Sequence, residues 1–125
     1  MKKLVLMFLI VAFFAVGCAP KVKPMYYWGN YSQTLYSMKK NPGDKTTAAH
    51  QACLVQIIKD SEAHNTRVPP GVYGELGFMC MQEKKDQDAI KYFKTEETTY
   101  PESSVLMEKL IASAKSDEKS DSEQK

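Results

Sequence analysis

Apolar side chains recur through the middle of the chain at the spacing of a helix face, three or four residues apart. No segment shows the strict alternation of a strand bounded by turn residues. Breaks rich in Pro and Gly, such as "NPGD" (41–44) and "RVPPG" (67–71), divide the pattern, and Pro101 ends a further stretch. The sequence therefore predicts an all-α fold of about five short helices: 31–40, Thr46 or Thr47 to about 65, about 71–83, about 87–99, and from Ser103 or Ser104 onward.

The same spacing predicts which side chains face the core. Asp86 is expected to cap the fourth helix. The expected inner faces are Tyr31, Leu35 and Met38; Ala49, Cys53, Leu54, Ile57 and Ile58; Tyr73, Leu76, Cys80 and Met81; Ala89, Ile90 and Phe93; and Leu106, Leu110 and Ile111.

The N-terminus has a different pattern. Two lysines precede about 13 consecutive apolar residues (4–16), which is short of the roughly 20 that a membrane-spanning helix needs. The order of charge and then apolar run is typical of a secretory signal. The run ends in "AVGC" (15–18), which resembles the lipobox of bacterial lipoproteins. The resemblance implies cleavage before Cys18 and fatty acyl chains, such as palmitate, on that residue; the alternative is an ordinary signal with an incidental cysteine.

The residue after Cys18 is Ala19 and not Asp, which in the lipoprotein sorting that the resemblance implies leads to the outer membrane, facing the periplasm. We expect a signal peptide at 1–17, a lipidated tether at 18–25, a helical domain at 26–114 and a disordered tail at 115–125, where "KSDEKSDSEQK" has no apolar residue. Removing the signal leaves 15 basic and 15 acidic residues, so no basic surplus indicates nucleic-acid binding.

The segment 72–100 resembles a tetratricopeptide repeat, which implies stacked helical hairpins. The positions that carry the resemblance are Tyr73, Leu76, Gly77, Ala89, Phe93 and Pro101. Cys80 stands where a large aromatic residue is usual, and Glu96 stands where a small residue is usual, which puts in doubt how tightly the next helix packs. The first half, 31–65, fits the frame poorly and is interpreted as a divergent repeat, with the fifth helix capping the stack.

The succession of "YYWGNY", "RVPPGVYGELG" and "YPES" over about 26–111 resembles a family of small proteobacterial lipoproteins of undefined function. Genes of that family often neighbour one for a lipoprotein that resembles the curli secretion channel. The resemblance implies an envelope protein as partner and supplies no catalytic residue.

Candidate chemistry is sparse. Cys53 and Cys80 lie on neighbouring predicted helices and would meet an oxidising periplasm, so we predict a disulfide between them; the alternative is two buried thiols. His50 and Cys53 share a helix face, but His64 lies more than three turns away, so we expect no metal site and no cofactor.

Tyr26, Tyr27, Trp28 and Tyr31 form the densest aromatic group. Either Trp28 and Tyr31 anchor the first helix into the core, or Tyr26, Tyr27 and Trp28 form a partner surface, or the group contacts the membrane interface. The expected function is that of a non-enzymatic, protein-binding adaptor or assembly factor, with no small-molecule substrate evident. The alternatives are an accessory activator or adaptor of cell-wall synthesis and, less favoured because no nucleophile–base pattern is seen, a hydrolase.

Overall fold

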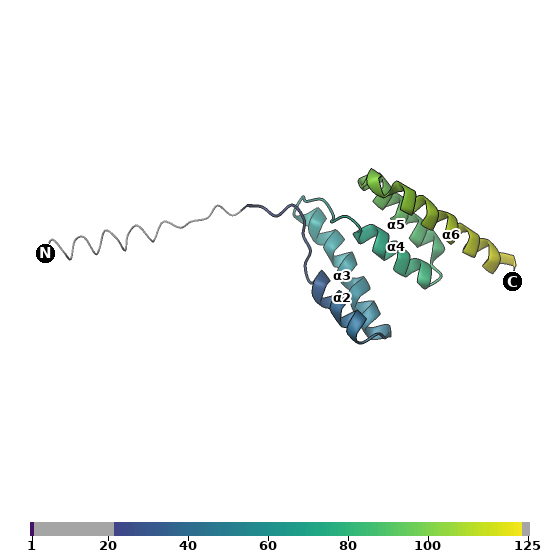
Figure 1. Ribbon diagram of the computed structural model, residues 1–125, viewed down its shortest axis with the longest axis horizontal. Coiled ribbons are helices and arrows are strands. Elements are labelled where there is room, and N and C mark those ends of the chain that lie inside the picture. The colour runs from purple at the N-terminus through teal and green to yellow at the C-terminus, as the bar shows by residue number, and fades with distance from the viewer. Residues whose placement is uncertain (2–21, 124–125) are drawn as a thin grey trace.

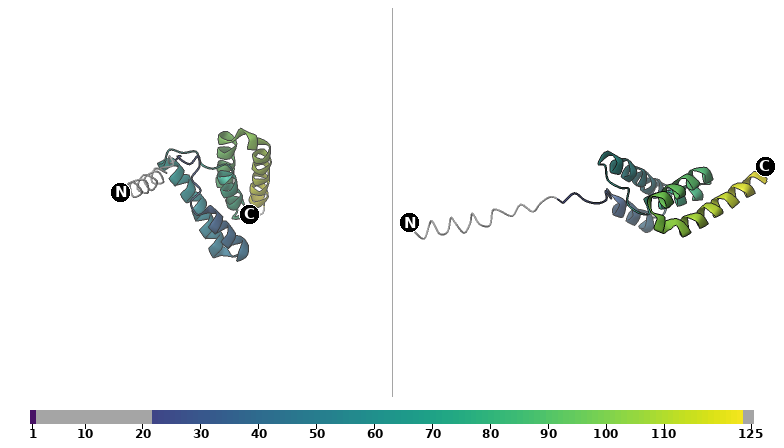
Figure 2. Two further views of the ribbon diagram at one scale, coloured as in Figure 1. Left: turned by 60° about the vertical axis from the view of Figure 1, so that its left-hand side comes forward. Right: turned by 90° about the horizontal axis from the view of Figure 1, so that it is seen from above.

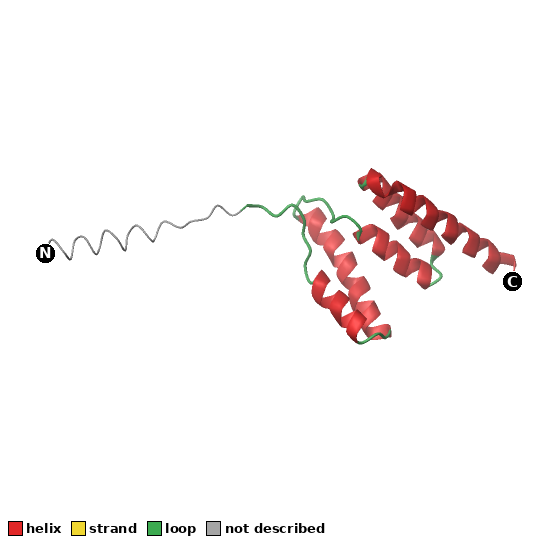
Figure 3. Cartoon of the chain, viewed as in Figure 1, coloured by secondary structure: helices red, strands yellow, loops and turns green. Residues whose placement is uncertain are grey.

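The computed structural model describes residue 1 and residues 22–123, and side chains as far as 116. Residues 2–17 of the proposed signal peptide, Cys18 and residues 19–21 of the tether lie outside the described residues. Within the described part, the prediction of an all-α fold with about five helices is confirmed (Figure 3). The elements are α2 (Tyr31–Lys40), α3 (Asp44–Ala63), α4 (Val72–Gln82), α5 (Asp86–Thr99), the 3-10 turn η1 (Pro101–Ser103) and α6 (Ser104–Glu123).

Helices adjacent in sequence pack against each other (Figure 1). α2 lies against α3, and α4, α5 and α6 form a second group, which the rotated view in Figure 2 separates from the first. The contact between the groups is made mainly by α3 and α4. None of the described helices is both long and apolar enough to cross a membrane.

Two apolar clusters fill the interior. The first joins α3, the α3–α4 connection and α4, and contains Leu54, Ile57, Val68, Val72, Leu76 and Met79. The second joins α4, α5 and α6, and contains Cys80, Ala89, Phe93 and Met107. Burial of these side chains is the main favourable contribution to the fold.

The chain between α3 and α4 is fastened to the end of α5. The Arg67 guanidinium donates a hydrogen bond to the Thr99 carbonyl at 2.8 Å and lies 4.9 Å from the centre of the Tyr100 ring. The Tyr100 hydroxyl donates to the Val68 carbonyl. A main-chain bridge also joins Arg67 to Tyr26 at the start of the domain. These bonds fix the connection that sets α4 relative to α3.

The buried stripe of α3 differs from the predicted one. Ala49 is exposed, and the fully buried positions are His50, Leu54, Ile57 and Ser61. Their spacing of four, three and four residues is that of one helix face. The prediction was wrong at the N-terminal end of α3 because it counted apolar residues only. His50 is polar, and its hydrogen bonds offset the cost of burying it.

The inner face of α6 is also rotated from the predicted one. Leu106 is exposed, while Met107 and Ala114 are buried and Leu110 and Ile111 are half-buried. Met107 approaches α4 at Gly74, where a Cβ would lie 3.4 Å from the Met107 Cε. The small residue on α4 therefore selects Met107, not Leu106, as the inward side chain.

Three boundaries differ from the predicted ones. α3 begins at Asp44 with Gly43 as its N-cap, ahead of the predicted start at Thr46 or Thr47. Asp86 is the first residue of α5 and makes no side-chain cap, and the N-cap is Lys85. The segment predicted to be a disordered tail is helical as far as Glu123. Extending a helix that is already formed costs far less than starting one, so a polar segment can continue α6 without apolar contacts of its own.

Candidate functional site

Two adjoining hollows lie along α4, and we call them together the groove. The α6-side hollow has a volume of about 520 Å³ and lies between α4, η1 and α6. The α2-side hollow, of about 440 Å³, lies between α4 and the residues around the α2–α3 turn. Glu75 and Phe78 of α4 line both hollows. The groove is therefore a surface to which helices from both groups contribute.

The groove exposes apolar side chains. Phe78 is 43 % exposed and Leu106 is 57 % exposed, and both line the α6-side hollow together with Met107 and Leu110. Phe78 lies outside the buried stripe of α4, which contains Leu76, Gly77, Met79 and Cys80. Exposed apolar side chains that line one depression are typical of an interaction surface, whereas scattered ones are not.

A polar network underlies the groove. The Glu75 carboxylate accepts a hydrogen bond from the Tyr31 hydroxyl at 2.8 Å and lies 3.0 Å from His50 Nε2. His50 Nδ1 lies 2.8 Å from the Thr34 hydroxyl. Burial, followed by the hydrogen bond to Glu75 and its negative charge, raises the pKa of Tyr31 to about 12. The network links α2, α3 and α4 through one carboxylate.

This hydroxyl–imidazole–carboxylate chain differs from the hydrolytic triad. In a triad the hydroxyl bonds Nε2 and the carboxylate bonds Nδ1, whereas here the two are exchanged. Thr34 also hydrogen-bonds the Tyr31 carbonyl of its own helix, at 3.0 Å. It lines a separate hollow with Tyr27 and Cys53, whereas Glu75 lines the groove. The arrangement positions helices relative to each other and does not direct a nucleophile at the groove.

A second carboxylate fixes the start of α4. The side chain of Glu96, on α5, is buried and accepts hydrogen bonds from the amides of Gly71 at 2.7 Å and Gly74 at 3.3 Å. These amides have no partner within their own helix, and a negative charge is favoured at a helix N-terminus. Gly71 has φ of +89°, which glycine adopts without strain. Glu96, unexpected in the repeat frame, thus caps the helix that follows "RVPPG".

The chain matches the model of a family described as Domain of unknown function (DUF4810), over residues 25–110. The chain belongs to this family. No curated protein and no solved structure matches it. The family description assigns no activity or partner to the DUF4810 domain.

The six residues of the predicted repeat signature lie on α4, α5 and η1 of the DUF4810 domain. Leu76, Ala89 and Phe93 are buried, and Tyr73 stacks on Tyr92 with ring centres 6.5 Å apart. A Cβ on Gly77 would lie 2.8 Å from the Phe93 ring and 3.1 Å from the Ala89 carbonyl. Pro101 begins η1. Gly77 is therefore required by the close approach of α4 and α5.

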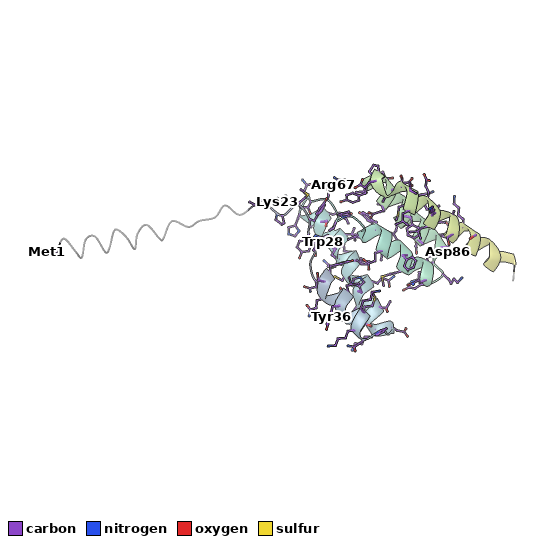
Figure 4. The ribbon with its side chains drawn as sticks, in the orientation of Figure 1. Met1, Lys23, Trp28, Tyr36, Arg67 and Asp86 are labelled. Carbon is purple, nitrogen blue, oxygen red and sulfur yellow. The ribbon has the colours of Figure 1, made fainter. Side chains whose placement is uncertain are left out.

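The aromatic group at the start of the DUF4810 domain is divided between two environments. Tyr26 and Tyr27 are half-buried, and the Tyr27 ring stacks on His64 with centres 5.3 Å apart. Trp28 is 42 % exposed, with its edge against Tyr31. Figure 4 shows Lys23, Trp28 and Arg67 near one end of the helices. Among Tyr26, Tyr27 and Trp28, Trp28 alone is exposed.

Cys53 and Cys80 are free thiols, which differs from the predicted disulfide. Cys53 packs against the first apolar cluster and lines the hollow with Thr34, whereas Cys80 belongs to the second cluster. The α3 side chain that bonds Cys80 is Gln51, which is half a turn away from Cys53. The two thiols therefore belong to different apolar clusters. In the described residues, no group of three or more His, Cys, Asp or Glu is placed to hold a metal.

Sequence reasoning did not identify the residues of the groove. Phe78 and Glu75 belong to none of the predicted inner faces, and Leu106 is predicted to face the core. A signal was present for Phe78, since it is a large apolar residue directly after the Leu76–Gly77 pair that faces the core. For Glu75 no local signal exists, because its partners Tyr31 and His50 are far away in sequence.

Proposed function

We propose that this protein is a lipid-anchored, non-enzymatic adaptor that binds another protein of the cell envelope through the groove. The observation that carries the proposal is the exposure of Phe78 and Leu106 in one depression about 520 Å³ in volume. Apolar side chains that are exposed together on one patch mark interaction sites, and aromatic residues such as Phe are enriched in protein interfaces. Stacked helical hairpins of the tetratricopeptide kind use such concave faces to hold peptides or helices.

The lipobox-like "AVGC" and the short tether support the place of action. Acyl chains on Cys18 would hold the domain at the periplasmic face of the outer membrane, because several chains together anchor a protein firmly. Eight residues from Cys18 to Tyr26 span at most about 26 Å when extended. The groove would then work close to the membrane surface, where other anchored proteins are the nearest partners. By the family resemblance, the partner is a lipoprotein similar to the curli secretion channel.

Site-specific photo-crosslinking in the native envelope tests the proposal. A photoreactive residue at position 78 or 106 is expected to crosslink to one envelope protein, identified by mass spectrometry. Position 105 is the matched control, because Val105 is exposed and apolar but does not line the groove. Docking in the groove would be contradicted if positions 105 and 106 captured an envelope protein equally well. It would also be contradicted if neither position 78 nor position 106 captured one. Absence of labelled palmitate from the protein would contradict the anchor.

A further inference from the structure

The charges that line the α6-side hollow have one sign. Its described lining contains the carboxylates of Glu75, Glu96 and Glu102, and no lysine, arginine or histidine. The α2-side hollow shares Glu75 but also contains Lys39, so of the two hollows the one beside η1 and α6 has charges of a single sign. The rest of the α6-side lining is mostly apolar.

The three carboxylates differ in what they can offer a ligand. Glu96 is buried and its charge is directed at the amides of Gly71 and Gly74. The side chain of Glu75 is 28 % exposed, with Tyr31 and His50 on its inner side. Glu102 is exposed in η1, beside the apolar Leu106. Two carboxylates therefore border an apolar depression at which water is partly excluded.

We propose that the α6-side hollow binds a segment of the partner that carries apolar side chains with lysine or arginine among them. This inference rests on the proposed function and names the chemistry of its partner. The long stems of lysine and arginine pack on apolar surface while their charged ends remain in solvent, so such a side chain lies along Phe78 or Leu106 and reaches Glu75 or Glu102. Charge complementarity at a partly desolvated site adds specificity to apolar contact.

A pair of designed peptides tests the inference with the full chain in detergent. Both are fluorescein-labelled amphipathic 14-residue peptides with the same leucine face, and one carries four lysines where the other carries four glutamates. In fluorescence anisotropy titrations, the lysine peptide is expected to bind about tenfold more tightly, which corresponds to two modest charge contacts. The difference decreases as salt is added, because exposed charges are screened.

Variants of the full chain show which part of the surface causes the preference for the lysine peptide. Glu102→Lys is expected to remove most of the preference for the lysine peptide, whereas Glu108→Lys, an equal change of charge at an exposed position of α6 outside the groove, leaves it intact. Leu106→Ser is expected to weaken both peptides. Equal affinity of the two peptides, or equal effects of Glu102→Lys and Glu108→Lys, overturns the inference. If either of these results were found while positions 78 and 106 still captured an envelope protein, the docking function would stand. Only the inference that the partner segment carries both basic and apolar side chains would be refuted.

Discussion

Replacement of Glu96 by glutamine removes one negative charge while keeping the shape of a buried side chain. Oε1 accepts the amide of Gly71 at 2.7 Å, and Oε2 accepts that of Gly74 at 3.3 Å. A glutamine can preserve the first bond with its single oxygen. Its amino group then meets the Gly74 amide, so two donors face each other and the start of α4 loses its compensating charge.

The magnitude follows from three contributions. A hydrogen bond to a charged group contributes about 1.5–3 kcal/mol, of which the longer bond to Gly74 is at the low end. Interaction of a partly buried charge with a helix N-terminus contributes up to about 2 kcal/mol. This loss of stability is offset in part, because a neutral glutamine costs less to bury than a charged carboxylate. We expect Glu96→Gln to lower the free energy of unfolding by about 1–3 kcal/mol, within the range for loss of a helix cap and a buried hydrogen bond.

Urea denaturation followed by circular dichroism at 222 nm measures this change. With a urea m-value of about 1.5 kcal/mol/M, a loss of about 2 kcal/mol moves the midpoint by about 1.3 M. Glu97→Gln is the matched control on the same helix: Glu97 is half-buried and lines neither the groove nor the start of α4, so its midpoint should change little. A midpoint for Glu96→Gln that equals the control would refute the assignment of Glu96 as the cap of α4.

Three further outcomes are expected. Gly77→Ala is expected to destabilise the fold by about 1–3 kcal/mol in the same assay, because the added Cβ would lie 2.8 Å from the Phe93 ring. A Cβ at Gly43 would meet nothing within 4 Å, so the control Gly43→Ser is expected to be near neutral. Equal urea midpoints of the two variants would contradict the close approach of α4 and α5. Since the pKa of Tyr31 is raised from 10 to about 12, its neutral form contributes stability that is fully present below pH 10 and is lost as pH rises towards 12; Tyr31→Phe should flatten that decline in urea midpoints. Without reductant, iodoacetamide should label Cys53 before Cys80, because Cys80 is buried and burial raises the pKa of its thiol; a mass two daltons lower that resists labelling would instead indicate a disulfide.

The helices could be predicted because their signals are local. Proline and glycine mark the breaks, and α2 begins and ends where the periodicity places it, at Tyr31 and Lys40. The repeat resemblance also singles out Gly77, Ala89 and Phe93, which lie where α4 and α5 approach closely. Each of these signals involves residues within about one hairpin of each other.

The groove and its polar network could not be predicted, because they depend on contacts between distant segments. His50 is buried by Thr34 and Glu75, which lie 16 and 25 residues away from it. A hydropathy pattern predicts that a histidine and a glutamate lie on the surface. The tertiary fold supplies the hydrogen-bond partners that offset the cost of burying them. Similarly, Glu96 appears out of place in a repeat frame until the amides of α4 stand opposite it.

The backbone bridge between Tyr26 and Arg67 has a mechanical consequence. The chain that leads from the N-terminus meets the domain beside the α3–α4 connection, and Lys23 there donates a hydrogen bond to the His64 carbonyl at 3.1 Å. Tension on that segment, from any anchor ahead of it, would be transmitted to the joint between the two helical groups before it reached α2. Displacement of that segment is therefore expected to change the angle at this joint, and with it the width of the surface that both groups share.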